Sequence, residues 1–164
     1  MKNSIFELLQ PVGLQKALRR YANYSRERRV DRYWSSLSDE SIKIAVDNAI
    51  TLIGSLTDAQ IRDIDFLEKS LLPRLGLNNE MLHEQPLHLK DCYGKGLHIW
   101  QYPIQFAPFL AWLAENGSGI KKYLEIGVRW GGTFIAVSEF LRRVSPVFEL
   151  SIAVDPIEPS PLMR

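Results

Sequence analysis

The sequence has few of the features that mark secreted, membrane-spanning or disulfide-rich proteins. Cys92 is the only cysteine among the 164 residues, which excludes an internal disulfide and agrees with a reducing compartment. The N-terminus has no long apolar region followed by a small-residue cleavage site. The longest uncharged apolar run, residues 106–114, contains a proline and is too short for a membrane-spanning helix, which needs about 20 residues. We therefore expect a soluble, cytoplasmic protein.

The chain also lacks an excess of either charge. Lysine and arginine number 20 against 19 aspartate and glutamate, a net charge of +1, so bulk charge favours neither nucleic acid nor a membrane surface as partner. One local exception is the stretch 19–34, where arginines alternate with tyrosines and a tryptophan, a composition that can bind phosphates and stack bases. Glu27 and Asp31 offset this charge. Nucleic-acid binding is therefore the less favoured interpretation.

Metal-binding residues are scarce as well. His83, His88 and His98 are the only histidines, and their irregular spacing, without paired acids or a second cysteine, matches no metal-ligand pattern. We expect no metal site. Hydrophobic residues make up 46% of the chain, enough to form a packed core.

The first hundred residues predict helices joined by loops. Ser38 can cap a helix, and Thr57 and Gln60 form a capping-box pattern before a second helix, in which Pro73 causes a bend or an end before Gly76. The apolar positions expected to be buried in the first helix are Ile42, Val46, Ala49, Ile50 and Ile53. Those expected in the second are Ile61, Ile64, Leu67, Leu71 and Leu75.

The rest of the chain predicts an α/β fold. A helix over 103–115, with Phe106, Phe109, Leu110 and Leu113 on one side, precedes a short strand at 123–127. A helix over 133–144 and a second strand at 150–155 complete a βαβ unit with parallel strands. The expected organisation is a helical N-terminal extension, residues 1–97, followed by residues 98–164 as the start of a Rossmann-like domain.

Within that unit, the sequence YLEIGVRWGGTF at 123–134 places Gly127, Gly131 and Gly132 in the turn from the first strand to the helix. Glycines there allow a ligand to approach the backbone at the positive end of the helix dipole. The common phosphate-binding motif is missing its lysine, because Thr133 follows Gly132 directly. The dinucleotide motif is missing a glycine, because Arg129 stands in its place.

What remains is an acid before the glycines and a second acid, Asp155, after the second strand. Glu125 can accept hydrogen bonds from an ammonium group, while the N–H groups of the turn and the Thr133 hydroxyl can donate to a carboxylate. Asp155 can accept both hydroxyls of a ribose. An amino acid joined to a nucleoside matches this arrangement, and S-adenosylmethionine is such a molecule.

At these residues the chain resembles the class I S-adenosylmethionine-dependent methyltransferases. LEIGVRWGGT at 124–133 is most similar to the variant in catechol-type and caffeoyl-CoA-type O-methyltransferases and in the cephalosporin-hydroxylase-like group. IAVDP at 152–156 resembles the family's second strand, and QFAPFLAWL at 105–113 resembles the helix before the first strand. The resemblance covers roughly residues 98–158.

The resemblance implies a Rossmann-like fold, S-adenosylmethionine as cofactor and methyl transfer to a small molecule, most plausibly at a hydroxyl. The cofactor-binding residues it implies are Glu125, Gly127, Gly131, Gly132, Thr133 and Asp155. The family's later strands, with its catalytic base, would follow Arg164, so the chain is expected to lack the catalytic half and no catalytic residue is named.

Several alternatives stay open. The chain is also compatible with a non-catalytic truncated product or interaction module, with a βαβ turn that binds no cofactor, and with a methyltransferase that acts on RNA. Trp130 can line a methionine pocket or pack as an ordinary aromatic, and His98, Gln101 and Tyr102 can border the cofactor or form a plain loop. A first strand with a free edge would favour self-association, so a homo-oligomer is among the expected partners.

Overall fold

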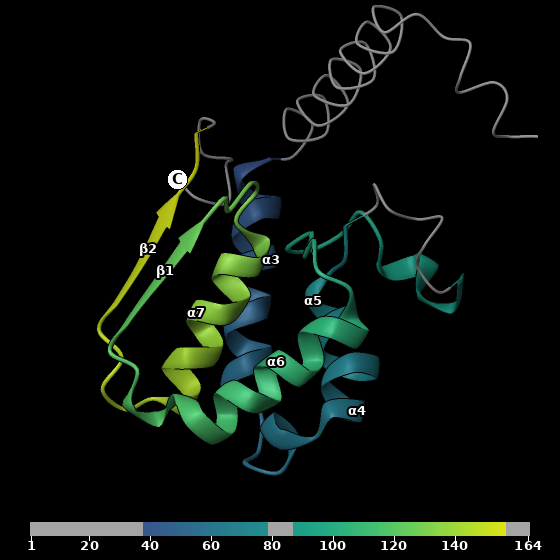
Figure 1. Ribbon diagram of the computed structural model, residues 1–164. Coiled ribbons are helices and arrows are strands. Elements are labelled where there is room, and N and C mark those ends of the chain that lie inside the picture. The colour runs from purple at the N-terminus through teal and green to yellow at the C-terminus, as the bar shows by residue number, and fades with distance from the viewer. Residues whose placement is uncertain (1–37, 79–86, 157–164) are drawn as a thin grey trace, which may run out of the picture. The chain divides into compact units, whose positions relative to one another are not determined.

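The computed structural model describes residues 38–78 and 87–156 (Figure 1). Residues 39–164 belong to one compact unit, so the helices of residues 39–97 and the βαβ unit are parts of the same body. The expected boundary between residues 97 and 98 stays a prediction. None of the helices in the described ranges is long and apolar enough to cross a bilayer. The arginine-rich stretch 19–34 and His83 lie outside the described residues.

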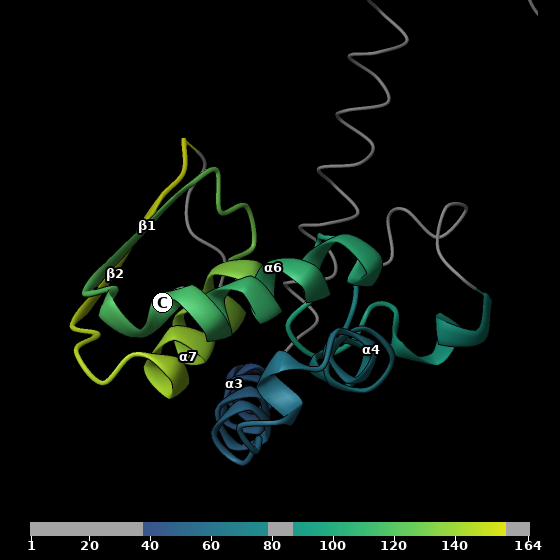
Figure 2. The ribbon, with the colours of Figure 1, turned by 60° about the horizontal axis from the view of Figure 1, so that its bottom comes forward.

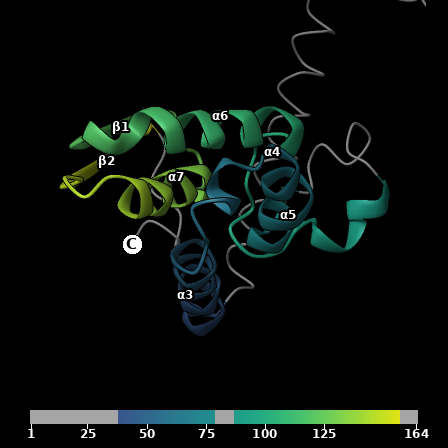
Figure 3. The same ribbon diagram turned by 90° about the horizontal axis from the view of Figure 1, so that it is seen from below.

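The first described helix, α3 (Asp39–Gly54), begins directly after Ser38, as predicted. It packs against α7 (Gly132–Val144), which also contacts α6 (Pro103–Asn116), so that α7 lies between the two (Figure 3). Of the residues expected in its buried stripe, Ile42, Ala49 and Ile53 are buried, Val46 is half-buried and Ile50 is exposed. The stripe is therefore narrower than its sequence pattern suggested.

The second helix is interrupted near its start, which corrects the prediction of one continuous helix. The capping-box bonds form, because the Gln60 amide donates to Thr57 Oγ1 at 3.2 Å and Thr57 N–H donates to Gln60 Oε1 at 3.0 Å. They open only a 3-10 turn, Gln60–Arg62, after which Asp63 is extended and its side chain accepts the Phe66 amide. The helix restarts there as α4 (Ile64–Phe66). This break turns Ile64 outward, where it is 45% exposed.

Beyond α4 the helix accommodates Pro73 by widening one turn. Residues Leu67–Leu71 form a π-helical turn in which the Leu72 amide donates to the Leu67 carbonyl, five residues back. Such turns are rare and appear mostly singly inside α-helices. Pro73, which has no N–H to donate, then lies at the start of α5 (Leu72–Leu75), and Gly76 follows with a φ of 99°. The predicted end of the helix before Gly76 is thus confirmed. The remaining predicted core residues of this segment, Ile61, Leu67, Leu71 and Leu75, are buried.

Two parallel strands and α7 form the predicted βαβ unit, which confirms the α/β fold (Figure 2). Strand β1 (Lys122–Ile126) pairs with β2 (Leu150–Val154), with Leu124 opposite Ile152. The bounds of α6, β1, α7 and β2 agree with the sequence prediction to within one residue. Within α6, Phe106, Leu110 and Leu113 are buried as expected, whereas Phe109 is 40% exposed.

The two faces of the small sheet differ. On the inner face, Tyr123 stacks on Phe134 of α7, with their ring centroids 5.8 Å apart. On the other face, five apolar side chains are 43–77% exposed. They are Leu124, Ile126, Leu150, Ile152 and Val154. Parallel sheets are normally covered on both faces, so this exposed apolar face is unusual; self-association through the β1 edge stays a prediction.

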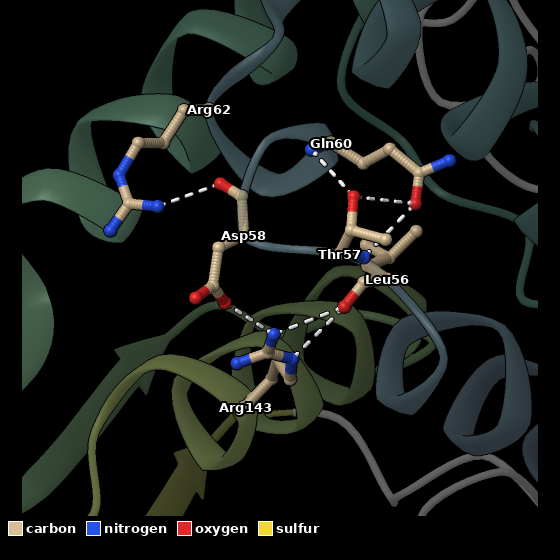
Figure 4. Close-up of polar contacts among 6 residues, drawn as sticks. All are labelled: Leu56, Thr57, Asp58, Gln60, Arg62 and Arg143. Atoms are coloured by element: carbon tan, nitrogen blue, oxygen red, sulfur yellow. Dashed lines mark hydrogen bonds and ion pairs between the residues drawn. The ribbon is translucent and has the colours of Figure 1, made fainter.

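Arg143 fastens α7 to the loop after α3 (Figure 4). Its guanidinium donates from Nε and Nη2 to the Leu56 carbonyl oxygen at 3.2 and 3.1 Å, and Nη2 lies 2.6 Å from Asp58 Oδ1. The guanidinium lowers the pKa of Asp58 by this hydrogen bond and by its charge. The helices before residue 97 and the βαβ unit are therefore joined by directed polar contacts as well as by apolar packing.

We expect Arg143→Ala to lower the free energy of unfolding by about 1–2 kcal/mol, because the Leu56 carbonyl loses its charged donor. Urea denaturation measures the change. Arg142→Ala is the matched control: Arg142 is 67% exposed and pairs with Glu139 in its own helix, so its loss should cost less than about 0.5 kcal/mol. Equal effects of the two substitutions would show that the contact with Leu56 does not stabilise the fold.

Candidate functional site

The glycine turn between β1 and α7 is built around left-handed backbone conformations. Gly127 has a φ of 81° and Gly131, the N-cap of α7, has a φ of 85°. The Gly127 amide extends the ladder by donating to the Val154 carbonyl at 2.7 Å, and the Gly131 amide closes the turn on the Val128 carbonyl at 2.8 Å. Side chains disfavour such φ values. The backbone alone therefore accounts for two of the three glycines.

Gly132 is required for a different reason, namely close packing. A Cβ at this position would lie 1.8 Å from the Leu97 carbonyl oxygen and 2.8 Å from the Leu97 carbonyl carbon. The first residue of α7 thus touches the backbone of the segment that precedes α6. By contrast, a Cβ at Gly127 would meet no atom within 4 Å. The open side of the turn, where a ligand has room to approach, is accordingly at Gly127. None of the three glycines depends on a ligand for its explanation.

Asp155 lies beside the turn, as its position after β2 suggested. Its Oδ2 accepts the Arg129 amide at 2.7 Å. Arg129 is itself left-handed, with a φ of 51°, which is uncommon for a residue with a long side chain. The carboxyl end of β2 is thereby tied to the loop that follows β1. The position of Asp155 beside the turn was expected from the sequence, whereas its hydrogen bond with the Arg129 backbone was not.

Glu125 lies on the inner face of β1 and has an intramolecular partner. The Tyr123 hydroxyl donates to Glu125 Oε2. Burial raises the pKa of Glu125, and the hydrogen bond from Tyr123 opposes that shift. Burial, followed by the interaction with Glu125, also raises the pKa of Tyr123. Tyr123 is a residue that the sequence argument missed, although it faces the same way as Glu125 by the two-residue period of a strand.

Thr133, in the first turn of α7, meets the segment before α6. Its hydroxyl forms a hydrogen bond with Gln101 Oε1. Gln101, His98 and Tyr102 were expected either to border the site or to form a plain loop. The structure brings Gln101 and His98 to the turn, since His98 packs edge-on against Trp130 with their ring centroids 6.3 Å apart.

His98 is buried and neutral at physiological pH. Only 3% of the residue is exposed, and burial lowers the pKa of its imidazole from 6.5 to about 4, while a backbone hydrogen bond with Gly94 opposes the shift. Its φ of 54° is left-handed. A neutral ring at this position adds no positive charge beside the Arg129 guanidinium.

An arginine in contact with two tryptophans completes the site. The Arg129 guanidinium carbon lies 3.7 Å from the Trp100 ring centroid and 4.5 Å from the Trp130 ring centroid. The two indoles meet edge to face, with centroids 5.7 Å apart. We call Trp100, Arg129 and Trp130 the tryptophan clamp. Cation–π contacts of this kind are attractive and strongest with tryptophan. Trp100 was missed because no local sequence pattern connects it to a turn almost thirty residues later.

No known protein family, curated protein or solved structure matches the chain. Within residues 38–78 and 87–156, no group of three or more histidine, cysteine, aspartate or glutamate side chains is placed to hold a metal ion. The candidate site is therefore identified from its geometry alone. It consists of a glycine turn at a helix N-terminus, an acid within β1, a second acid after β2, and a cationic side chain in contact with two tryptophans.

Proposed function

We propose that the turn between β1 and α7 binds S-adenosylmethionine and that the protein is a class I methyltransferase acting on a small molecule, with a hydroxyl as methyl acceptor. One observation carries the proposal: Asp155, at the carboxyl end of β2, lies at the glycine turn that follows β1. Ligands of open α/β sheets bind at the carboxyl ends of the strands, and a helix N-terminus there favours anionic groups.

The residues at the turn fit the parts of this ligand. A carboxylate has about four acceptor positions on its two oxygens, so accepting the Arg129 amide does not by itself prevent Asp155 from accepting ribose hydroxyls. The open space at Gly127 leaves room for close approach. The first amides of α7 can donate to the ligand carboxylate, as can the Thr133 hydroxyl once it turns away from Gln101, with Gly131 and Gly132 shaping that end of the turn. When bound, S-adenosylmethionine supplies the methyl group.

Glu125 can bind the ligand only if its carboxyl accepts hydrogen bonds from Tyr123 and from the ligand at the same time. Its carboxyl already accepts from Tyr123, and it binds an ammonium group best when ionised. A cationic ligand would lower the pKa that burial raises. Tyr123 then orients the carboxylate while the second oxygen accepts from the ligand.

Substitution of Asp155 tests the proposal directly. Asp155→Ala removes charge-assisted hydrogen bonds to ribose, each worth about 1.5–3 kcal/mol, so the dissociation constant of S-adenosylmethionine should rise at least tenfold, since about 1.4 kcal/mol is a factor of ten. Isothermal titration calorimetry measures it. A 2′-deoxyribose analogue should bind the wild-type protein more weakly but lose less on substitution.

The control is Asp155→Asn, which keeps an oxygen acceptor for the Arg129 amide but loses the charge. It should preserve the stability of the fold while still weakening the ligand. If removal of the 2′-hydroxyl weakens binding equally in the wild-type protein and in Asp155→Ala, the ribose must bind elsewhere. Absence of binding to the wild-type protein would remove the proposal.

A second candidate, an interaction module without catalysis, is favoured by the exposed apolar face of the sheet. Exposed contiguous apolar patches commonly mark contacts with other proteins. The same titration separates the two candidates, because an interaction module predicts no affinity for S-adenosylmethionine.

A further inference from the structure

Two residues other than glycine have a positive φ in the part of the chain that the structure describes, and they lie together. They are His98 and Arg129, with φ of 54° and 51°. Both belong to the contact between the segment before α6 and the glycine turn. Left-handed conformations at such residues are unfavourable and persist only where surrounding contacts hold them. The contacts that hold Arg129 therefore determine the form of the turn.

Arg129 is held at both ends. Its amide donates to Asp155 Oδ2 at 2.7 Å, and its guanidinium lies against the rings of both Trp100 and Trp130. Trp130 is its chain neighbour and moves with the turn. Trp100 comes from a separate segment and makes the closer of the two ring contacts, at 3.7 Å. It is therefore the fixed member of the tryptophan clamp.

The segment that carries Trp100 is itself anchored on both sides. The Ile99 amide donates to the Gly76 carbonyl at 2.9 Å, and the Leu97 amide donates to the Leu75 carbonyl at 2.8 Å. Toward the turn, the Leu97 carbonyl packs against Gly132. The Trp100 ring is thus presented from a backbone that is hydrogen-bonded on one side and close-packed on the other.

We infer that Trp100 is a positioning residue: by stacking on the Arg129 guanidinium, it keeps the Arg129 backbone in the left-handed conformation that directs its amide to Asp155. The turn and the acid are thereby oriented before any ligand arrives. The consequence for ligand affinity rests on the proposed function, but the effect on the Arg129 amide does not.

The test compares Trp100→Ala, Arg129→Gly and the double variant of the full chain. Glycine adopts a positive φ without penalty and keeps the amide that Asp155 accepts, so Arg129→Gly no longer needs the ring. Hydrogen exchange of the residue-129 amide, followed by NMR, is the readout. Trp100→Ala should lower the protection factor at least tenfold. Arg129→Gly should keep protection within about threefold of wild type, and adding Trp100→Ala to it should change nothing further.

Three controls separate positioning from general destabilisation. The Phe140 amide, in the core of α7, reports global opening. Trp112→Ala, in α6, removes a tryptophan that is 55% exposed and should leave residue 129 unchanged. Trp100→Phe keeps an aromatic face and should restore most of the protection, and it also serves if Trp100→Ala does not fold. Unchanged protection in Trp100→Ala, or an equal loss in the Arg129→Gly background, would overturn the inference.

Ligand titration forms a second, separable arm. If the wild-type protein binds S-adenosylmethionine, Trp100→Ala should weaken it at least fivefold, and the same substitution made in Arg129→Gly should have little effect. If the wild-type protein does not bind, the proposed function fails while the exchange result still decides the role of Trp100. A fivefold loss that persists in the Arg129→Gly background would mean that Trp100 acts on the ligand by itself, which contradicts positioning through Arg129.

Discussion

Alanine at position 132 is expected to lower the free energy of unfolding by about 3 kcal/mol or more, at the upper end of overpacking effects. The added Cβ would lie 1.8 Å from the Leu97 carbonyl oxygen, well inside van der Waals contact. The atom it meets belongs to the backbone, and that backbone is hydrogen-bonded to Leu75. Neither side can yield without breaking other contacts, so the strain cannot be relieved by a change of rotamer.

Urea denaturation followed by circular dichroism measures this loss. Gly54→Ala and Gly119→Ala are matched controls, because a Cβ at either position meets nothing within 4 Å and neither has a positive φ. Both should change stability by less than about 1 kcal/mol, and Gly54→Ala should tend to stabilise, because it lowers the entropy of the unfolded chain. Wild-type stability in Gly132→Ala would mean that the segment before α6 does not pack on the start of α7.

The second large effect is a loss of stability on mild acidification. The pKa of His98 is about 4 in the folded protein and about 6.5 when unfolded. Between these values the unfolded chain binds the proton and the folded protein does not. His98 therefore does not reduce the free energy of unfolding well above about pH 6.5, and reduces it progressively as the pH drops toward 4. From these two pKa values, His98 contributes a loss of about 2 kcal/mol between pH 7 and pH 5.

The comparison is with His98→Asn, because asparagine tolerates a left-handed backbone and does not titrate here. Its free energy of unfolding should vary less over this range, and the difference between the two proteins isolates His98. Glu125 acts in the opposite sense: its raised pKa means that stability falls as the pH rises above 4.5 until the folded group ionises. This contribution of Glu125 is the same in both proteins, so it cancels when their pH profiles are compared. Parallel pH profiles would show that the pKa of His98 is the same in the folded and unfolded protein.

The elements predicted from periodicity agree with the structure where apolar spacing decides the outcome. The strands, α6 and α7 are short segments with one dominant pattern, and their ends are marked by Gly117, Gly127 and Ser145. The predicted start of the second helix was wrong because Asp63 caps a helix of its own by accepting the Phe66 amide. The capping box at Thr57 competes with that cap, and apolar spacing contains no information about which of two adjacent caps begins the longer helix.

The positions of the two acids were predictable from the sequence, whereas their hydrogen-bond partners and Trp100 were not. Glu125 and Asp155 were placed by their positions after or within strands, which follows from the strand period and from parallel pairing. Their partners, the Tyr123 hydroxyl and the Arg129 amide, depend on side-chain and turn geometry that the sequence does not encode locally. The same holds for Trp100, whose contact with Arg129 arises only once α6 and α7 are packed together.

The approach of Gly132 to Leu97 has a consequence for how such chains drift over evolutionary time. A lineage that stopped using the turn for any ligand would still lose its fold on replacing Gly132, and purifying selection would retain the residue. The positive φ of Gly127 and Gly131 would slow their replacement in the same way. A recognisable glycine signature can therefore outlive the activity it once accompanied. Divergence at positions such as Asp155, Glu125 and Thr133 is the better record of whether descendants of this chain still use the turn.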